Sequence, residues 1–202
     1  GIGFSVRVMP EEKEALIAQM QKQGMKNFTI RPDFKRSEDN SIIYLEPLDR
    51  RNQVAIGFDM FTESVRRAAM SRARDTGAPT ATGKVTLLQE IDQHKQAGFL
   101  IYIPVFRNRI PDTVAQRRAS LIGFAYSPFR LDNLMAGIFG NQEQHYVDFQ
   151  IYDGSSVSSQ NLLYSSTGNI STSYQPRFRT TKTFDVAGQT WAIAFASRSE
   201  FE

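Results

Sequence analysis

The sequence predicts an α+β fold whose sheets are antiparallel. Segments with strand composition alternate with segments of helical periodicity, but without the regular strand–helix repeat of doubly wound folds. Beyond residue 140 only strand-like segments follow. Two of these are joined by Val186-Ala187-Gly188, a sequence typical of a hairpin turn. These observations favour layered antiparallel sheets covered by a few helices.

The first third of the chain predicts two strands around a helix. Residues 2–8 alternate apolar with small or polar side chains, as a strand does. Pro10, followed by two glutamates, predicts the start of a helix, and Gly24 predicts its end. Two further strands are expected at residues 28–30 and 42–48, with an exposed polar loop between them at residues 31–40.

The middle of the chain predicts a strand at residues 54–59 and a helix at residues 61–74. The helix carries apolar side chains at spacings of three and four residues. It is expected to end at Thr76-Gly77-Ala78-Pro79, because glycine adopts a left-handed conformation easily and proline cannot continue a helix.

The rest of the chain predicts strands, one loop and one helix. Strands are expected at residues 80–89, 98–106, 119–127, 145–152, 162–165, 178–186 and 189–196, a polar loop at residues 108–118, and a helix at residues 129–139. We place a domain boundary near Pro128, which divides the chain into residues 1–127 and residues 128–202.

The composition is that of a folded globular protein. Apolar residues make up 41% and charged residues 22%, so disorder and coiled-coil classes are excluded. No stretch approaches the roughly 18 apolar residues of a membrane span. Lys and Arg outnumber Asp and Glu by only 24 to 21 and are scattered, so no nucleic-acid partner is expected.

The sequence carries no marker of catalysis. The absence of cysteine excludes disulfides and thiolate chemistry. His94 and His145 have no metal-ligand spacing, and neither a G-x-S-x-G turn nor a glycine-rich phosphate loop occurs. We therefore expect no catalytic residue, no metal and no cofactor.

Four motifs together resemble one family, the CHASE domain. They are Ile56-Gly57-Phe58-Asp59, Arg72-Ala73-Arg74-Asp75-Thr76-Gly77, Val85-Thr86-Leu87-Leu88-Gln89-Glu90 and Ile101-Tyr102-Ile103-Pro104-Val105. The resemblance implies two PAS-like lobes: a membrane-distal ligand-binding lobe at residues 1–127, and a linking helix with a membrane-proximal lobe at residues 128–202. It also implies a long N-terminal stalk helix, which this sequence does not contain.

The same resemblance implies a sensor that binds a small ligand and catalyses nothing. Family members lie on the periplasmic or extracytoplasmic side of the membrane, are tethered by flanking segments, and act as homodimers. They signal to a cytoplasmic histidine kinase, diguanylate cyclase, phosphodiesterase or adenylate cyclase.

Arg66 is the most informative of the binding residues that the resemblance implies. In plant cytokinin receptors of this family an acidic residue at the matching position holds the adenine ring, so the charge here is reversed. A guanidinium matches carboxylate or phosphate in a planar, bidentate manner, which predicts an anionic ligand rather than a free purine. The alternative is that Arg66 faces solvent beside Arg67.

The resemblance places seven more residues at ligand-binding positions. They are Met60, Thr82, Leu88 and Tyr102, with Ser120, Ile122 and Phe124 on the strand opposite. Met60 and Leu88 are equally compatible with plain core packing. Alternation along residues 98–106 puts the Tyr102 hydroxyl on one defined sheet face, where a buried O–H needs a partner.

Two other functions stay open at the level of sequence. The chain could be a ligand-free structural module that dimerises, which a pocket already filled by side chains would favour. It could also bind anions or nucleic acid through its arginines, and affinity would then fall steeply with salt.

Overall fold

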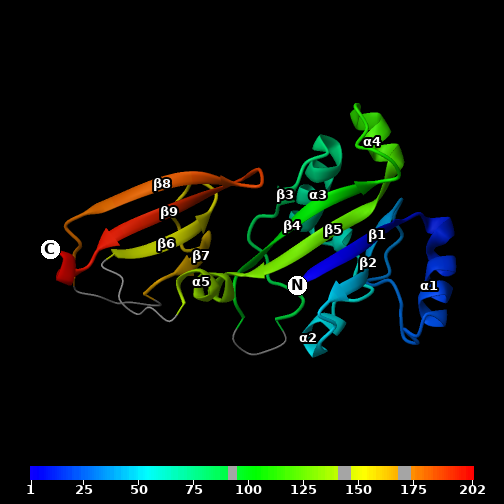
Figure 1. The fold of residues 1–202 in the computed structure, drawn as a ribbon, viewed down its shortest axis with the longest axis horizontal. Helices are drawn as coiled ribbons and strands as arrows, with labels where there is room; N and C mark the ends of the chain where they lie inside the picture. Colours follow the sequence, from blue (N-terminus) through cyan, green and yellow to red (C-terminus); the bar gives the residue numbers. More distant parts are fainter. Residues whose placement is uncertain (91–94, 141–146, 168–173) are drawn as a thin grey trace.

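The structure, a computed structural model, describes residues 1–90, 95–140, 147–167 and 174–202. Two antiparallel sheets lie one after the other along the long axis of the molecule (Figure 1). The predicted α+β class with two PAS-like lobes is confirmed. His94 and His145 lie outside the described residues.

The first sheet has five strands in the order β2-β1-β5-β4-β3. The strands are β1 (Ile2–Val8), β2 (Asp39–Glu46), β3 (Thr80–Ala81), β4 (Gly98–Phe106) and β5 (Leu121–Arg130). β1 pairs with both β2 and β5, and β4 pairs with β5 along nearly its full length. The first strand of the chain therefore lies inside this sheet, between β2 and the central strand β5.

The second sheet has four strands in the order β7-β6-β9-β8. They are β6 (Val147–Asp153), β7 (Leu162–Ser165), β8 (Arg179–Val186) and β9 (Gln189–Ser197). Ala187 and Gly188 join β8 to β9 with φ values of 48° and 77°, which is the left-handed pair that a tight hairpin requires. The predicted hairpin is confirmed.

In the described ranges, five α-helices accompany the sheets. They are α1 (Lys13–Lys22), α2 (Arg50–Gln53), α3 (Ser64–Thr76), α4 (Val114–Ser120) and α5 (Leu131–Phe139), with 3₁₀ turns η1 (Pro10–Glu12), η2 (Met60–Thr62) and η3 (Ser199–Phe201). We call the first sheet with α1 to α4 the first lobe, and the second sheet with α5 the second lobe. Among the described residues no helix is long and apolar enough to cross a membrane.

Several short apolar segments pack rather than pair. In the segments that the structure describes, residues 28–30, predicted as a strand, form no bridge, and residues 54–59 form only two isolated ones, Phe58 with Arg31 and Asp59 with Ser41. Phe28 and Ile30 are buried against α1 instead. Of the strand predicted at residues 80–89 only β3 forms. β-rich composition here reflects burial more than pairing: residues 57–59 reach the outer edge of β2 only through the hydrogen bonds of Gly57 and Phe58 with Ile42 and the bridge of Asp59 with Ser41.

The region predicted as a loop at residues 108–118 contains α4. Thr113 caps this helix. Its hydroxyl accepts a hydrogen bond from the Gln116 backbone amide at 3.3 Å, and its own backbone amide donates to Gln116 Oε1. This is a capping box, which was overlooked because the arginines nearby suggested a solvated loop. β5 begins immediately after α4, at Leu121.

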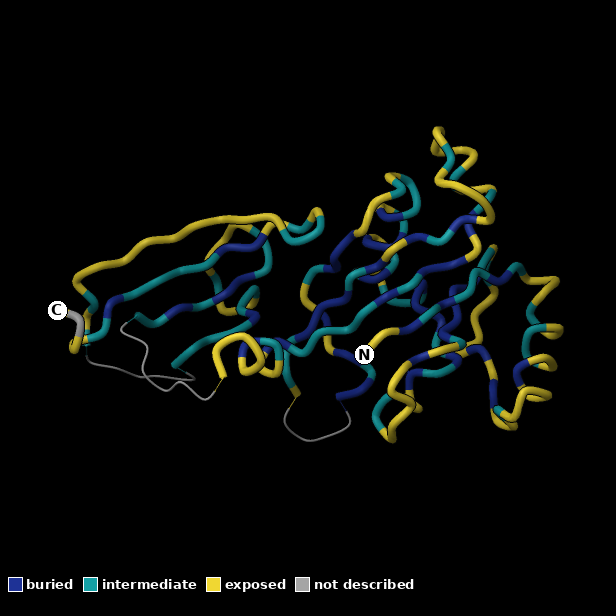
Figure 2. Tube along the Cα trace, in the orientation of Figure 1, coloured by how far each residue is buried: buried dark blue, intermediate teal, exposed yellow. Residues whose placement is uncertain are grey.

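β4 has a separate core on each of its faces. Leu100 and Tyr102 belong to the core of the first lobe, beneath α3, whereas Phe99 and Ile101 contribute to the core of the second lobe. Figure 2 shows buried residues along β4 and β5, while β8 is exposed along most of its length. One strand of the first sheet therefore completes the packing of both lobes.

Polar contacts also join the lobes. The Ala81 amide donates to the Ala187 carbonyl at 2.9 Å. The Asp153 carboxylate accepts from the Lys84 amide and from Gln189 Nε2, both at 2.8 Å. A Cβ at Gly83 would lie 2.7 Å from Asp153 Oδ2, so glycine permits this close approach.

Candidate functional site

The Ile-Gly-Phe-Asp motif positions the start of α3. Gly57 has φ +83°, and a Cβ there would lie 2.2 Å from the Thr29 carbonyl oxygen, so only glycine fits. Asp59 is fully buried, and its Oδ1 accepts from the amides of Asn40 at 2.8 Å and Phe61 at 3.0 Å. The motif therefore has a structural role: Asp59 holds the segment before α3 against β2.

Glu63 then begins α3. Its carboxylate accepts from the amides of Val65 and Arg66, both at 2.9 Å, which caps the N-terminus of the helix and suits its dipole. These contacts fix the first turn of α3 above the sheet. They place Met60 just before the helix and Arg66 in its first turn, both buried.

Arg66 is buried, with 4% of its surface exposed, so it does not face solvent as most helix arginines do. Its Nη2 donates to the Thr86 carbonyl at 3.1 Å, and its guanidinium lies 5.5 Å from the centre of the Phe58 ring. Among the described residues no carboxylate pairs with it. A guanidinium has five N–H donors, and within the described part of the chain only Nη2 of Arg66 uses one of them, on the Thr86 carbonyl.

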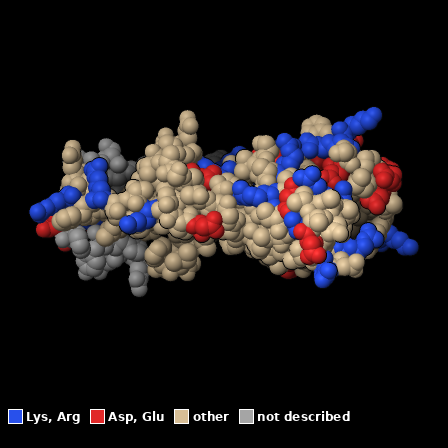
Figure 3. Space-filling model, turned by 90° about the horizontal axis from the view of Figure 1, so that it is seen from above, with Lys and Arg blue, Asp and Glu red and all other residues tan. Residues whose placement is uncertain are grey.

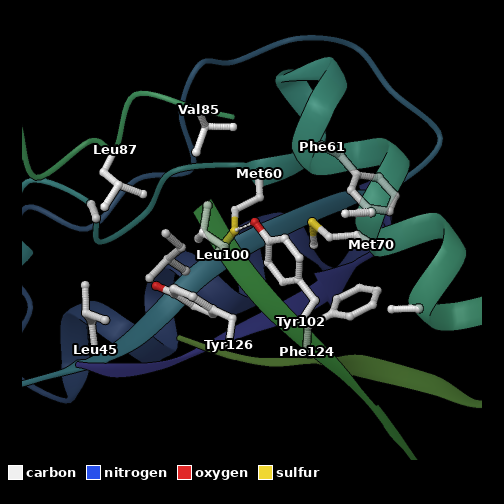
Figure 4. Close-up of a cluster of buried hydrophobic side chains, with 14 of the residues drawn as sticks. Leu45, Met60, Phe61, Met70, Val85, Leu87, Leu100, Tyr102, Phe124 and Tyr126 are labelled. Carbon is white, nitrogen blue, oxygen red and sulfur yellow. Dashed lines mark hydrogen bonds between the residues drawn. The ribbon is translucent and has the colours of Figure 1, made fainter. Parts of the chain in front are cut away.

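Tyr102 lies at the centre of the same core (Figure 4). It is fully buried, and its hydroxyl donates to Met60 Sδ at 2.9 Å, a weak acceptor. Its ring is 6.0 Å from the rings of Phe124 and Tyr126. Burial raises the pKa of Tyr102 far above its usual value, so the phenol is neutral at every physiological pH.

Tyr126 belongs to this site, although sequence reasoning did not select it. Burial raises its pKa strongly, and within the described part of the chain its hydroxyl has no hydrogen-bond partner. The side chain fits because residue 3 is glycine: a Cβ there would lie 2.4 Å from Tyr126 Cζ. Alternation from Phe124 along β5 was the available signal.

Thr82 and Leu88 support the site from the segment after β3. The Thr82 hydroxyl donates to the Gly83 carbonyl at 2.7 Å and accepts from the Leu100 amide at 3.0 Å, so it holds this segment against β4. Leu88 is partly buried and packs against the same core. Thr82 thus adjoins β4, and Leu88 adjoins the first-lobe core.

Ser120 and Ile122 do not lie with the others on the inner face of β5. Ser120 is the last residue of α4, and its hydroxyl donates to the Gln116 carbonyl at 2.8 Å. A β-bulge pairs Val105 with Gly123 but Phe106 with Leu121, which leaves Ile122 unpaired and 36% exposed. The predicted strand therefore began too early, and strict alternation failed at the bulge.

The Arg-Ala-Arg-Asp-Thr-Gly motif ties helices together. Asp75 accepts from Arg118 Nε at 2.9 Å and from Arg74 Nε at 2.8 Å, and Arg74 also reaches Glu38 at 3.4 Å. Gly77 ends α3 with φ +74°, which confirms the predicted stop. Charges that suggested an exposed binding surface are thus neutralised within the fold.

The centre of the first lobe is filled by side chains. Met60 and Met70 occupy the space between α3 and β4, around the Tyr102 ring (Figure 4). Methionine is flexible and polarizable, so it adapts to altered surroundings more readily than branched side chains do. Among the described residues no group of three His, Cys, Asp or Glu side chains is placed to hold a metal ion.

Three comparisons relate this chain to known proteins. The family model of the CHASE domain matches residues 1–164. The chain is 24% identical over 191 residues to hybrid signal transduction histidine kinase A of Dictyostelium discoideum; the match covers 84% of this chain and 9% of that protein.

Among solved structures, the chain resembles an extracellular ligand binding receptor from Desulfohalobium retbaense DSM5692. The TM-score is 0.46 at 12% identity, over 78% of this chain and 28% of that one. The family match spans well over half of the sequence, including all four motifs. The chain therefore belongs to the CHASE domain family of extracellular sensory domains.

Proposed function

We propose that this chain is the ligand-binding part of a transmembrane signalling receptor, and that its first lobe binds a small anionic ligand. The observation that carries the proposal is the buried Arg66 guanidinium, for which the described residues supply a backbone carbonyl and an aromatic ring but no carboxylate. A buried cation without a counter-ion is costly, and an anionic ligand would remove that cost.

The hydroxyls of Tyr102 and Tyr126 favour the same class of ligand. Both phenols are neutral O–H donors, and neither has a strong acceptor within the described part of the chain. Burial raises the pKa of both phenols, and the nearby Arg66 charge opposes this rise only in part. One carboxylate group accepts from a guanidinium and from hydroxyls at once.

Wider features of the proposal follow from family membership. We infer an extracytoplasmic, periplasmic location, tethering through segments outside this chain, and a homodimeric receptor. The kinase relative supports signalling to a histidine kinase, and a diguanylate cyclase or phosphodiesterase is the alternative output. We also infer that the ligand-binding unit is residues 1–127, with residues 128–202 as the second unit.

A thermal-shift screen of carboxylates, amino acids and nucleobases tests the proposal, followed by calorimetry on the compound that shifts most. A ligand at 100 times its Kd stabilises by about 2.7 kcal/mol. We expect Arg66→Gln to weaken binding of that carboxylate about 10- to 100-fold, the equivalent of one charge-assisted contact.

Arg67→Gln is the matched control, because Arg67 lies next in the same helix and donates to the Phe61 carbonyl at 2.7 Å. It should leave the Kd unchanged. If Arg66→Gln binds as tightly as the parent while remaining folded, the anion proposal is wrong.

The filled centre of the first lobe favours a second candidate, a ligand-free module that only dimerises. Met60, Met70 and Tyr102 occupy the space that a ligand would need. A flat response across all compounds, with dimerisation retained, would support this module and not the receptor site.

A further inference from the structure

The second lobe has an apolar sheet face that α5 covers only in part. Cross-strand partners leave a sheet on the same face, so the register places Ile151 beside Ile193 and Phe184 beside Trp191 on one side. α5 packs over the β7 end of this face. Towards β8 no described segment covers this face, and Phe184 is 39% exposed although it is aromatic.

A cavity of about 710 Å³ occupies this uncovered region. Its walls are apolar side chains of α5, β6, β8 and β9, with Phe99 of β4 at the inner end. Ile138 on α5 is 60% exposed at its margin. A hollow of this size is within the range of small-molecule sites, and a walled hollow, unlike a flat patch, suits an occupant that inserts.

The lining excludes most polar ligands. None of its side chains carries a charge, and the single polar side-chain atom among them is the Trp191 indole nitrogen, which is buried and has no hydrogen-bond partner within the described part of the chain. A polar or charged group placed in this cavity would lose its hydrogen bonds to water without replacement. The part of the ligand that enters must therefore be hydrocarbon.

Lys182 indicates a second property of the ligand, a negative charge. It is the cross-strand partner of Ile193 and lies two residues from Phe184, so its side chain leaves the same sheet face as the cavity walls. It is exposed, and within the described part of the chain no carboxylate pairs with it. In Figure 3 the surface over this lobe is largely uncharged, with isolated basic and acidic groups.

We propose that this cavity binds a free, single-chain carboxylate amphiphile, such as a medium-chain fatty acid. The alkyl chain lies in the hollow and the carboxylate lies near Lys182 at its margin. This site is separate from the proposed site at Arg66, and its existence does not depend on that proposal.

Trp191 is the single tryptophan of the chain and lines the cavity, so its fluorescence reports occupancy directly. Titration with sodium dodecanoate below its micelle concentration should change Trp191 emission in a saturable manner. Decanoate, shorter by two methylenes, should bind about 15-fold more weakly, because each buried methylene changes affinity about fourfold.

Two variants separate the two parts of the ligand. Lys182→Gln should weaken dodecanoate about two- to fivefold, as expected for an exposed ion pair, and leave uncharged dodecanol unchanged. Ile138→Gln should weaken both ligands. Ile110→Gln is the matched control, since Ile110 is 58% exposed in the first lobe, and it should weaken neither.

Several results would overturn the proposal. These are the absence of a Trp191 response to dodecanoate, an affinity that does not depend on chain length, or dodecanoate binding by Lys182→Gln that is as tight as by the parent. Sedimentation showing that Ile138→Gln dissociates a dimer would instead assign the face to a second copy of the chain, and would also reject the proposal.

Discussion

Asp75→Asn tests whether the Arg-Ala-Arg-Asp-Thr-Gly motif stabilises the fold. The Asp75 carboxylate joins α3 to α4 through Arg118, and joins to Arg74 within α3. Arg74 is 14% exposed, so its charge-assisted bond contributes about 1.5–3 kcal/mol. Arg118 is 56% exposed, and solvent screens most of its contribution.

We therefore expect Asp75→Asn to lower the free energy of unfolding by about 2 kcal/mol. For a protein of this size that loss lowers Tm by about 4–8 °C. Chemical denaturation followed by circular dichroism measures the first quantity, and calorimetry measures the second. The matched control is Asp112→Asn: Asp112 Oδ2 lies 3.9 Å from Arg109 Nη2, and both side chains are more than four-fifths exposed.

The pH dependence adds a second criterion. Hydrogen bonds from Arg118 lower the pKa of Asp75, partial burial opposes this, and Arg74 assists it. A lowered folded-state pKa gives stability that is complete above the unfolded pKa, about 3.9, and is lost as pH falls towards the folded one. The difference between parent and Asp75→Asn should thus be constant near neutrality and shrink in acid. A difference below about 0.5 kcal/mol at pH 7, the range of ordinary surface substitutions, would refute the reasoning.

Two smaller predictions concern the proposed anion site. Gly57→Ala should destabilise the fold by at least about 1–3 kcal/mol, because φ is +83° and the new Cβ meets the Thr29 carbonyl; an unfolding midpoint equal to that of the parent would contradict this. Tyr126→Phe should leave stability nearly unchanged, because the hydroxyl has no partner within the described residues. It should nevertheless weaken binding of the carboxylate found by the screen several-fold. Calorimetric binding equal to that of the parent would remove Tyr126 from the site.

The sequence was sufficient for the elements that depend on local signals. The stop at Gly77 and the hairpin at Ala187-Gly188 follow from backbone conformations that few residues adopt. The strand predicted at residues 54–59 does not form, because within the described residues only Phe58 and Asp59 of this segment make bridges and most of the other apolar side chains are satisfied by burial. Whether such a segment pairs depends on which sheet edges the rest of the chain leaves free, and this is not a local property.

The candidate site was predictable in part for the same reason. Arg66 was selected by comparison with the family, and the structure then showed it buried without a counter-ion among the described residues. Ile122 was misplaced by one bulge, since a single extra residue reverses which side chains face the core. Tyr126 was missed because its space depends on Gly3, which is 123 positions away in sequence.

β4 connects the two proposed sites. Tyr102 packs in the first-lobe core beside Met60, and Phe99, on the opposite face of the same strand, lines the second-lobe cavity and stacks edge to face on Trp191 at 4.8 Å. A strand paired along nine positions with β5 does not twist one face independently of the other. A ligand that displaced Tyr102 would therefore move Phe99 as well, and Trp191 would report it. Sensitivity to Lys182→Gln distinguishes this indirect signal from direct occupancy of the cavity, because Lys182 lies on the sheet face of the second-lobe cavity and not in the first lobe.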